Sequence, residues 1–102
     1  MNDELRAIAH PTRLSILKSV SHRAHTVGEL ATQLALRQPA TSQHLQILRE
    51  ADLVIVRPVG NKRFYVANPN KLEMLRSYLD DFWKEILVAL KNASEQTGAE
   101  SE

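Results

Sequence analysis

The sequence predicts a mainly α-helical fold with one small β-hairpin, and two observations carry this prediction. Apolar residues recur every three or four positions in five segments of the 102-residue chain, which is the period of an amphipathic helix. After Ala51 this period gives way to two β-rich runs, residues 53–59 and 62–68, separated by the turn-forming pair Gly60-Asn61. The predicted order is therefore four helices, a hairpin and one long helix.

The first two helices meet at His10-Pro11. Residues 3–9 form a short helix, which ends there because the residue before a proline is pushed out of the helical region. Pro11 then suits the first position of the second helix, residues 11–22, since that position needs no backbone N–H donor.

The third and fourth helices form a helix-turn-helix. Thr26 and Glu29 match the T-x-x-E capping box, which predicts a helix over residues 27–35. A tight connection follows, and Pro39 begins the fourth helix, which continues to Glu50. Two short helices joined by about four residues are the pattern of a helix-turn-helix.

A hairpin directly after a helix-turn-helix defines a winged helix-turn-helix fold. Pro58 cannot donate a ladder hydrogen bond, so the first strand is expected to be an edge strand. Asn68-Pro69 ends the hairpin and caps a last helix at about residues 70–92. We expect residues 1–92 to form one winged domain, and the small, polar and acidic residues 93–102 to form a disordered tail.

The composition is that of an ordinary soluble protein, with 43% apolar and 25% charged residues. The chain has no cysteine and no apolar stretch long enough to span a membrane, so we expect a cytoplasmic location. The net charge of +1 hides an asymmetry: residues 37–63 carry five basic and two acidic side chains, and residues 64–102 four and seven. A basic middle segment can face a polyanion.

The fourth helix has an unusual polar face. Leu45 and Leu48, with Thr41 one turn earlier, mark its buried stripe. The rest of its first turns carries amides and hydroxyls, which suit the edges of DNA bases, whereas charged side chains hold phosphates but read little sequence. The alternative is a solvated helix that happens to be rich in glutamine.

Six residues of this helix are candidate DNA-binding residues. Ser42, Gln43 and Gln46 are expected to read bases. The full candidate set is Gln38, Thr41, Ser42, Gln43, His44 and Gln46. Gln38 and Thr41 are expected near phosphates, since the N-terminus of a helix suits an anion.

Basic side chains gather at the tip of the predicted hairpin. The candidate wing residues are Arg57, Asn61, Lys62 and Arg63. Extended arms of this kind reach along a duplex to its backbone or minor groove. The alternative is protection of an edge strand, because Lys and Arg there prevent unwanted sheet pairing.

Three stretches of the chain resemble the ArsR/SmtB family of bacterial winged-helix repressors. They are LRAIAHPTRLSIL, TVGELATQLALRQPATSQHLQILREADLV and RPVGNKRFYV, and the resemblance covers about residues 3–92. It implies a homodimer that binds double-stranded operator DNA and dimerises through its first and last helices. The dimer-interface residues expected on this basis are Leu5, Ile8, Leu72, Leu75, Leu79, Phe82, Trp83 and Ile86.

The chain departs from the metal-sensing members of that family. One class of sensor has two cysteines in an E-L-C-x-C context, whereas the matching stretch here, ELATQ, has none. Another class has His and Asp ligands on the last helix, but residues 71–92 contain no histidine. We therefore expect no metal and no cofactor, and the inducer is unknown. A metal site made by His22, His25 and a carboxylate of the partner chain is an alternative.

Nothing in the sequence indicates an enzyme, because it contains neither a nucleophile–base constellation nor a glycine-rich phosphate loop. The sequence predicts a homodimeric repressor that places its fourth helix in the major groove of an inverted repeat. A winged helix used for protein–protein contact is the alternative from another functional class.

Overall fold

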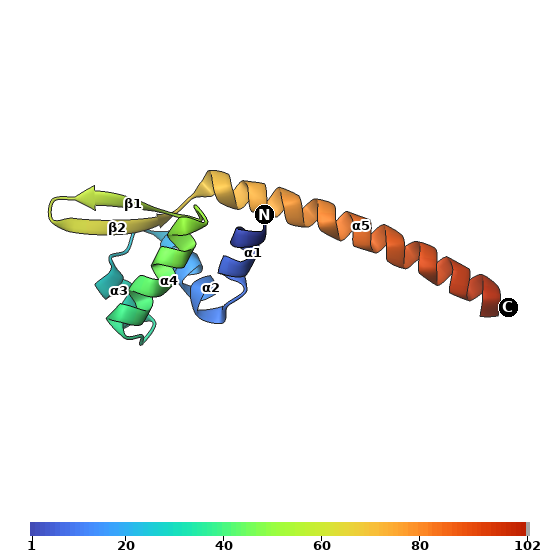
Figure 1. Cartoon of the computed structure of the whole chain (residues 1–102), viewed down its shortest axis with the longest axis horizontal. Coiled ribbons are helices and arrows are strands. Elements are labelled where there is room, and N and C mark those ends of the chain that lie inside the picture. The colour runs from blue at the N-terminus through green and yellow to red at the C-terminus, as the bar shows by residue number, and fades with distance from the viewer. Residues whose placement is uncertain (102) are drawn as a thin grey trace. The chain divides into compact units, whose positions relative to one another are not determined.

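The structure, a computed structural model, describes the backbone of residues 1–101 and the side chains of residues 1–95 (Figure 1). Its elements are α1 (Asn2–Ile8), α2 (Pro11–His22), α3 (Val27–Gln33), α4 (Gln38–Glu50), β1 (Val54–Val59), β2 (Lys62–Ala67) and α5 (Pro69–Ser101). The predicted order of helices and hairpin is confirmed. The chain divides into two compact units, Met1–Leu72 and Glu73–Glu102.

The core of the first unit is built from one apolar stripe on each of α2, α3 and α4, which lie side by side in Figure 1. Ile16, Leu30 and Leu45, one from each helix, are at most 1% exposed. Leu48 and Leu53 extend this core and are fully buried. Each such side chain contributes about 1.5–3 kcal/mol by leaving water, so the stripe fixes which face of α4 stays outside.

Side-chain caps start α2 and α3. The backbone N–H of Glu29 donates to the Thr26 hydroxyl over 3.2 Å, and the N–H of Thr26 donates to the Glu29 carboxylate over 2.9 Å. The predicted capping box is thus confirmed. α2 starts at Pro11 as predicted, and the ring nitrogen Nδ1 of His10 caps it by accepting from the N–H of Thr12 over 3.2 Å.

α3 and α4 are each followed, two residues beyond their end, by a residue with a positive φ. Ala35 has a φ of 54°, the N–H of Leu36 donates to the carbonyl of Ala31 over 2.8 Å, and the N–H of Ala35 donates to that of Thr32 over 3.3 Å. These two bonds form a Schellman motif, whose turning residue is most often glycine. Asp52, with a φ of 59°, turns the chain in the same way after α4. The motif ends α3 at Gln33, two residues earlier than predicted.

The wing is an antiparallel hairpin whose two-residue turn was predicted. Val59 pairs with Lys62 across Gly60-Asn61, and Gly60 has a φ of 62°, a value that glycine adopts without strain. β1 pairs only with β2, which makes it the edge strand expected from Pro58.

The other edge of β2 is paired with the segment before α3. The N–H of His25 donates to the carbonyl of Tyr65 over 3.1 Å, and the N–H of Tyr65 donates back over 2.7 Å. His25 is 2% exposed. The base of the wing is therefore tied to the start of the helix-turn-helix, a contact that the sequence did not predict.

α5 begins as expected, with the Asn68 side-chain oxygen accepting from the N–H of Lys71 over 3.4 Å. Its predicted end near residue 92 is wrong, because the helix continues to Ser101. Ala, Glu and Gln dominate that extension, and these residues favour a helix over the predicted coil. The side chains of residues 96–102 lie outside the described residues, so the disorder of residues 93–102 stays a prediction.

Candidate nucleic-acid interface

The exposed face of α4 carries the predicted base-reading residues. Ser42, Gln43 and Gln46 are exposed, whereas Leu45 and Leu48 on the opposite stripe are at most 1% exposed. Gln38 is exposed in the first turn of the helix. An apolar stripe that is fully buried fixes the rotation of α4, and this rotation turns the polar row outward.

Gln46 shares its amide with the end of the same helix. Its Nε2 atom donates to the carboxylate of Glu50 over 3.1 Å. The second Nε2 hydrogen and the carbonyl oxygen have no bond to this carboxylate, so the amide keeps one donor and one acceptor for another partner.

Thr41 does not belong to the candidate contacts. It is fully buried, and its hydroxyl donates to the carbonyl of Arg37 over 2.9 Å. The predicted position near a phosphate is wrong, because the small hydroxyl satisfies its hydrogen bond inside its own helix and the methyl group fills the core.

His44 is turned toward α2 instead of toward solvent. Its ring centroid lies 4.8 Å from that of His10, and its Nδ1 atom lies 3.5 Å from Nη1 of Arg13. Burial lowers the pKa of His44, and the nearby His10 and Arg13 lower it further. The half-buried ring therefore favours its neutral form and is engaged by His10 and Arg13, so His44 is not a member of the outward polar row of α4.

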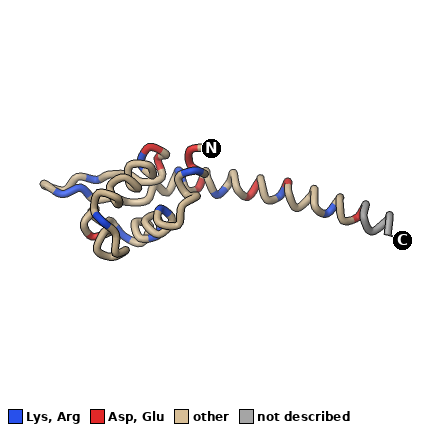
Figure 2. The backbone as a smooth tube through the Cα atoms, turned by 60° about the horizontal axis from the view of Figure 1, so that its bottom comes forward, with Lys and Arg blue, Asp and Glu red and all other residues tan. Residues whose placement is uncertain are grey.

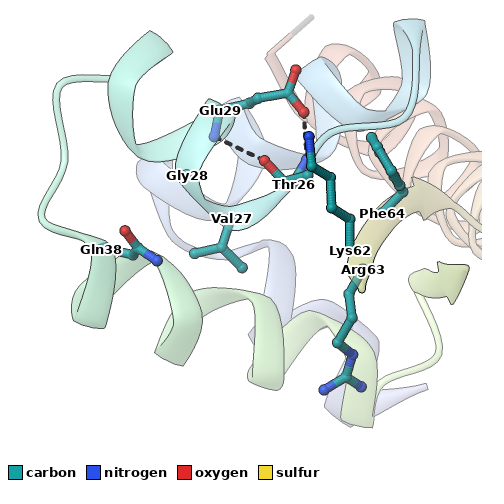
Figure 3. A pocket seen from close by; sticks show the side chains of 8 residues that line it. All are labelled: Thr26, Val27, Gly28, Glu29, Gln38, Lys62, Arg63 and Phe64. Atoms are coloured by element: carbon teal, nitrogen blue, oxygen red, sulfur yellow. Dashed lines mark hydrogen bonds between the residues drawn. The ribbon is translucent and has the colours of Figure 1, made fainter. Parts of the chain in front are cut away.

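The predicted wing residues Arg57, Asn61, Lys62 and Arg63 are all exposed. Lys and Arg appear on both strands of the hairpin in Figure 2. Neighbouring residues of a strand point to opposite faces. Figure 3 shows this for Lys62, which extends toward the start of α3, and Arg63, which extends toward α4.

A hollow of about 630 Å³ separates the wing from the two helices of the helix-turn-helix (Figure 3). Its lining comes from three places: the first turn of α3, the start of α4 and strand β2. The lining residues are Thr26, Val27, Gly28, Glu29, Gln38, Lys62, Arg63 and Phe64. The sequence predicted the contributions of Gln38, Lys62 and Arg63 but missed those of α3 and Phe64.

Glu29, the acidic residue that lines this hollow, already has hydrogen-bond and ion-pair partners within the chain. The backbone hydrogen bond from Thr26 is the main cause that lowers the pKa of Glu29, and Arg23 lowers it further from 3.6 Å away. Glu29 is therefore an ionised cap of α3, and the cations Lys62 and Arg63 face the hollow from the wing. A groove with an amide on one wall and cations on the other suits a phosphate backbone.

His25 of the alternative metal site is already engaged within the chain. Nδ1 of His25 lies 2.8 Å from the carbonyl of Arg23, and its Nε2 lies 3.0 Å from the side-chain oxygen of Gln33. Both ring nitrogens thus have partners within the chain, which leaves none to join His22 around an ion. Nor do three His, Asp or Glu side chains come together in a metal-binding group within the described part of the chain.

The predicted dimer face is only partly available to a partner. Leu5 and Ile8 of α1 are half-buried in the first unit. Leu75 is 5% exposed in the single chain, and its place in the interface stays a prediction. In the second unit, Phe82 and Trp83 are 46% and 56% exposed, with ring centroids 6.2 Å apart.

Among the described residues, no helix is long and apolar enough to cross a bilayer.

A buried helix-turn-helix core, an outward row of amides and hydroxyls, and a basic wing define a winged-helix DNA-binding protein. Residues 10–56 match the model of the family described as bacterial regulatory protein, arsR family. The chain belongs to the ArsR family and is a DNA-binding transcriptional regulator, not an enzyme.

Relatives and solved structures agree with this family. The chain is 40% identical over 93 residues to the HTH-type transcriptional regulator Rv2034 of Mycobacterium tuberculosis, covering 91% of this chain and 87% of that protein. It is 32% identical over 73 residues to the transcriptional repressor SdpR of Bacillus subtilis, covering 72% and 81%. The crystal structure of a possible transcriptional regulator for arsenical resistance superposes with a TM-score of 0.73 and 38% identity, over 85% and 94% of the two chains.

Proposed function

We propose that this regulator is a homodimeric repressor that binds an inverted-repeat operator without a metal effector. The outward row of Ser42, Gln43 and Gln46 on a helix locked by its apolar stripe carries the proposal. Each protomer would insert α4 into a major groove, with half-sites about one helical turn apart or a small multiple of it. A location in the cytoplasm, where chromosomal DNA lies, is part of the same proposal.

The contacts are divided between two parts of the protein. Ser42, Gln43 and Gln46 would bond base edges, and Gln38 would lie near a phosphate. Arg57, Asn61, Lys62 and Arg63 would hold the flanking backbone from the wing. Repressors such as SdpR among the relatives support repression as the outcome of binding.

Dimerisation is proposed through the apolar stripe of α5 together with α1. Leu79, Phe82, Trp83 and Ile86 follow one another at spacings of three, one and three residues, which places them on one side of the helix. Phe82 and Trp83 are too exposed to be explained by the core of a single chain.

The test is selection of bound fragments from genomic DNA, followed by a gel shift of the enriched duplex at two salt concentrations. An enriched inverted repeat, bound more weakly at high salt, is the expected result. Fragments without a shared sequence, or no salt-dependent binding, would favour a protein–protein contact module. We expect the affinity for the duplex to be the same with zinc and with a chelator. An affinity that depends on zinc would contradict the proposal that the repressor has no metal effector.

A further inference from the structure

Arg13 joins three separate parts of the first unit. Its Nε atom donates to the carbonyl of Ala7 over 2.6 Å and its Nη2 atom to that of Arg6 over 3.2 Å. Both carbonyls lie in the last turn of α1, where a cation is favourable, and that of Arg6 also accepts from the N–H of Ala9 over 3.2 Å. The remaining Nη1 atom faces Nδ1 of His44 on α4 over 3.5 Å.

Direct packing between α1 and the second half of α4 is incomplete. A hollow of about 270 Å³ lies between them. Its lining residues are Asp3, Arg6, Ala7, Arg13, Ile47, Glu50 and Ala51. Beside this hollow, Arg13 and His44 link α1 to α4 in addition to the direct contacts between the two helices.

We propose that Arg13 is a positioning residue for DNA recognition, which acts by holding His44 and thereby finely adjusts the rotation of α4 that the buried apolar stripe sets. This inference rests on the proposed function, since it concerns how the base-reading face of α4 is aimed. Gln43 precedes His44 in the chain, so a rotation that moves one side chain moves the other. Arg13 itself touches no DNA in this proposal.

A small rotation of α4 displaces the ends of its side chains far enough to affect their contacts with bases. The side chains of a helix end about 5–6 Å from its axis, so a rotation of about 10° displaces an amide by about 1 Å. A displacement of that size is sufficient to spoil a paired hydrogen bond to a base edge. Phosphate contacts made by the flexible Lys and Arg side chains of the wing tolerate it, because they depend on charge more than on alignment.

The experiment compares Arg13→Gln with the wild type on two duplexes of equal length, the enriched sequence and a scrambled one. We expect the ratio of the two affinities to fall roughly tenfold. Affinity for the scrambled duplex and its salt dependence should match those of Lys18→Gln, which removes one charge from an exposed position of the same helix. Combined with Gln43→Ala, Arg13→Gln should add little, because both changes act on the same base contact.

Equal losses on both duplexes, or a full additive loss in the double variant, would overturn the proposal. Thermal unfolding and the molecular mass of Arg13→Gln show whether it folds and assembles. If it does not fold, His44→Leu removes the same contact but leaves the bonds of Arg13 to α1, and unchanged discrimination in that variant overturns the idea. A wild type that shows no preference for the enriched duplex contradicts the proposed function instead.

Discussion

The rings of His10 and His44 lie 4.8 Å apart and are inclined by 51°. His10 caps the start of α2, and His44 comes from the middle of α4, so this contact joins the HPTR segment to the helix that carries the base-reading row. The contact places two ionisable rings and the cation Arg13 in a half-buried cluster. The charge state of this cluster should therefore influence the stability of the first unit.

Acidification is expected to destabilise the protein through His44. Its pKa in the folded chain lies below the ordinary value of 6.5, so the folded state favours the neutral ring and gains stability from it above that value. This contribution is lost as the pH falls from the ordinary value through the lowered one. Thermal unfolding between about pH 7.5 and about pH 5.5 should show a smaller decrease in Tm for His44→Gln than for the wild type.

Gln43→Ala should reduce sequence discrimination and leave general DNA affinity unchanged. Loss of one good bidentate pair with a base costs about 1–3 kcal/mol on the correct sequence only. Titration of the enriched and scrambled duplexes at one salt concentration measures the difference. Similar losses on both duplexes would show that Gln43 does not read a base.

Lys62→Ala should weaken binding to every duplex by a similar factor. Its ammonium group faces the hollow beside α3 and is expected to neutralise one phosphate. The slope of log affinity against log salt should decrease by about 1. Lys18→Ala is the matched control on α2, and an equal change of slope in that variant would argue against a special role of the wing.

Ala35→Gly should stabilise the fold, contrary to the usual effect of a glycine. Ala35 has a φ of 54°, and a residue with a Cβ atom is strained there by about 1 kcal/mol. Chemical denaturation should show a gain of about 0.5–1 kcal/mol in the free energy of unfolding. Ser15→Gly, in the middle of α2, is the control and should lower it.

Trp83→Asp should dissociate the proposed dimer. A charge in place of an exposed aromatic ring at the centre of an interface costs about 2 kcal/mol or more. Sedimentation equilibrium should show monomers at concentrations where the wild type is dimeric. Ser77→Asp adds the same charge two residues before Leu79, on the opposite side of α5, and should leave the mass unchanged.

The elements of the fold could be predicted because their signals are local. Thr26 with Glu29, Pro11, and Gly60-Asn61 each determine a helix start or a turn through bonds within a few residues. The turn at Ala35 could not be predicted this way, since alanine rarely adopts a positive φ. The pairing of His25 with Tyr65 spans forty residues, and no local pattern announces it.

The sequence pattern predicted which side of α4 faces outward, but only to within about one residue around the helix. The buried stripe of Leu45 and Leu48 was sufficient to predict that Gln43 and Gln46 lie on the exposed face of α4. They did not separate Thr41 and His44 from that row, because both residues are small or polar enough to lie at either side of the boundary. Their places depend on Arg37, His10 and Arg13, which are contacts of the folded chain.

The pairing of His25 with Tyr65 divides the hairpin into an anchored base and a free tip. Tyr65 pairs with Val56 of β1 on one side and with His25 on the other. Among the described residues, Val59 and Lys62 beside the Gly60-Asn61 turn pair only with each other. Length and sequence can therefore change at the tip while the base keeps its place. Another loop grafted between Val59 and Lys62 would change the backbone contacts of the tip and leave the base-reading face of α4 as it is.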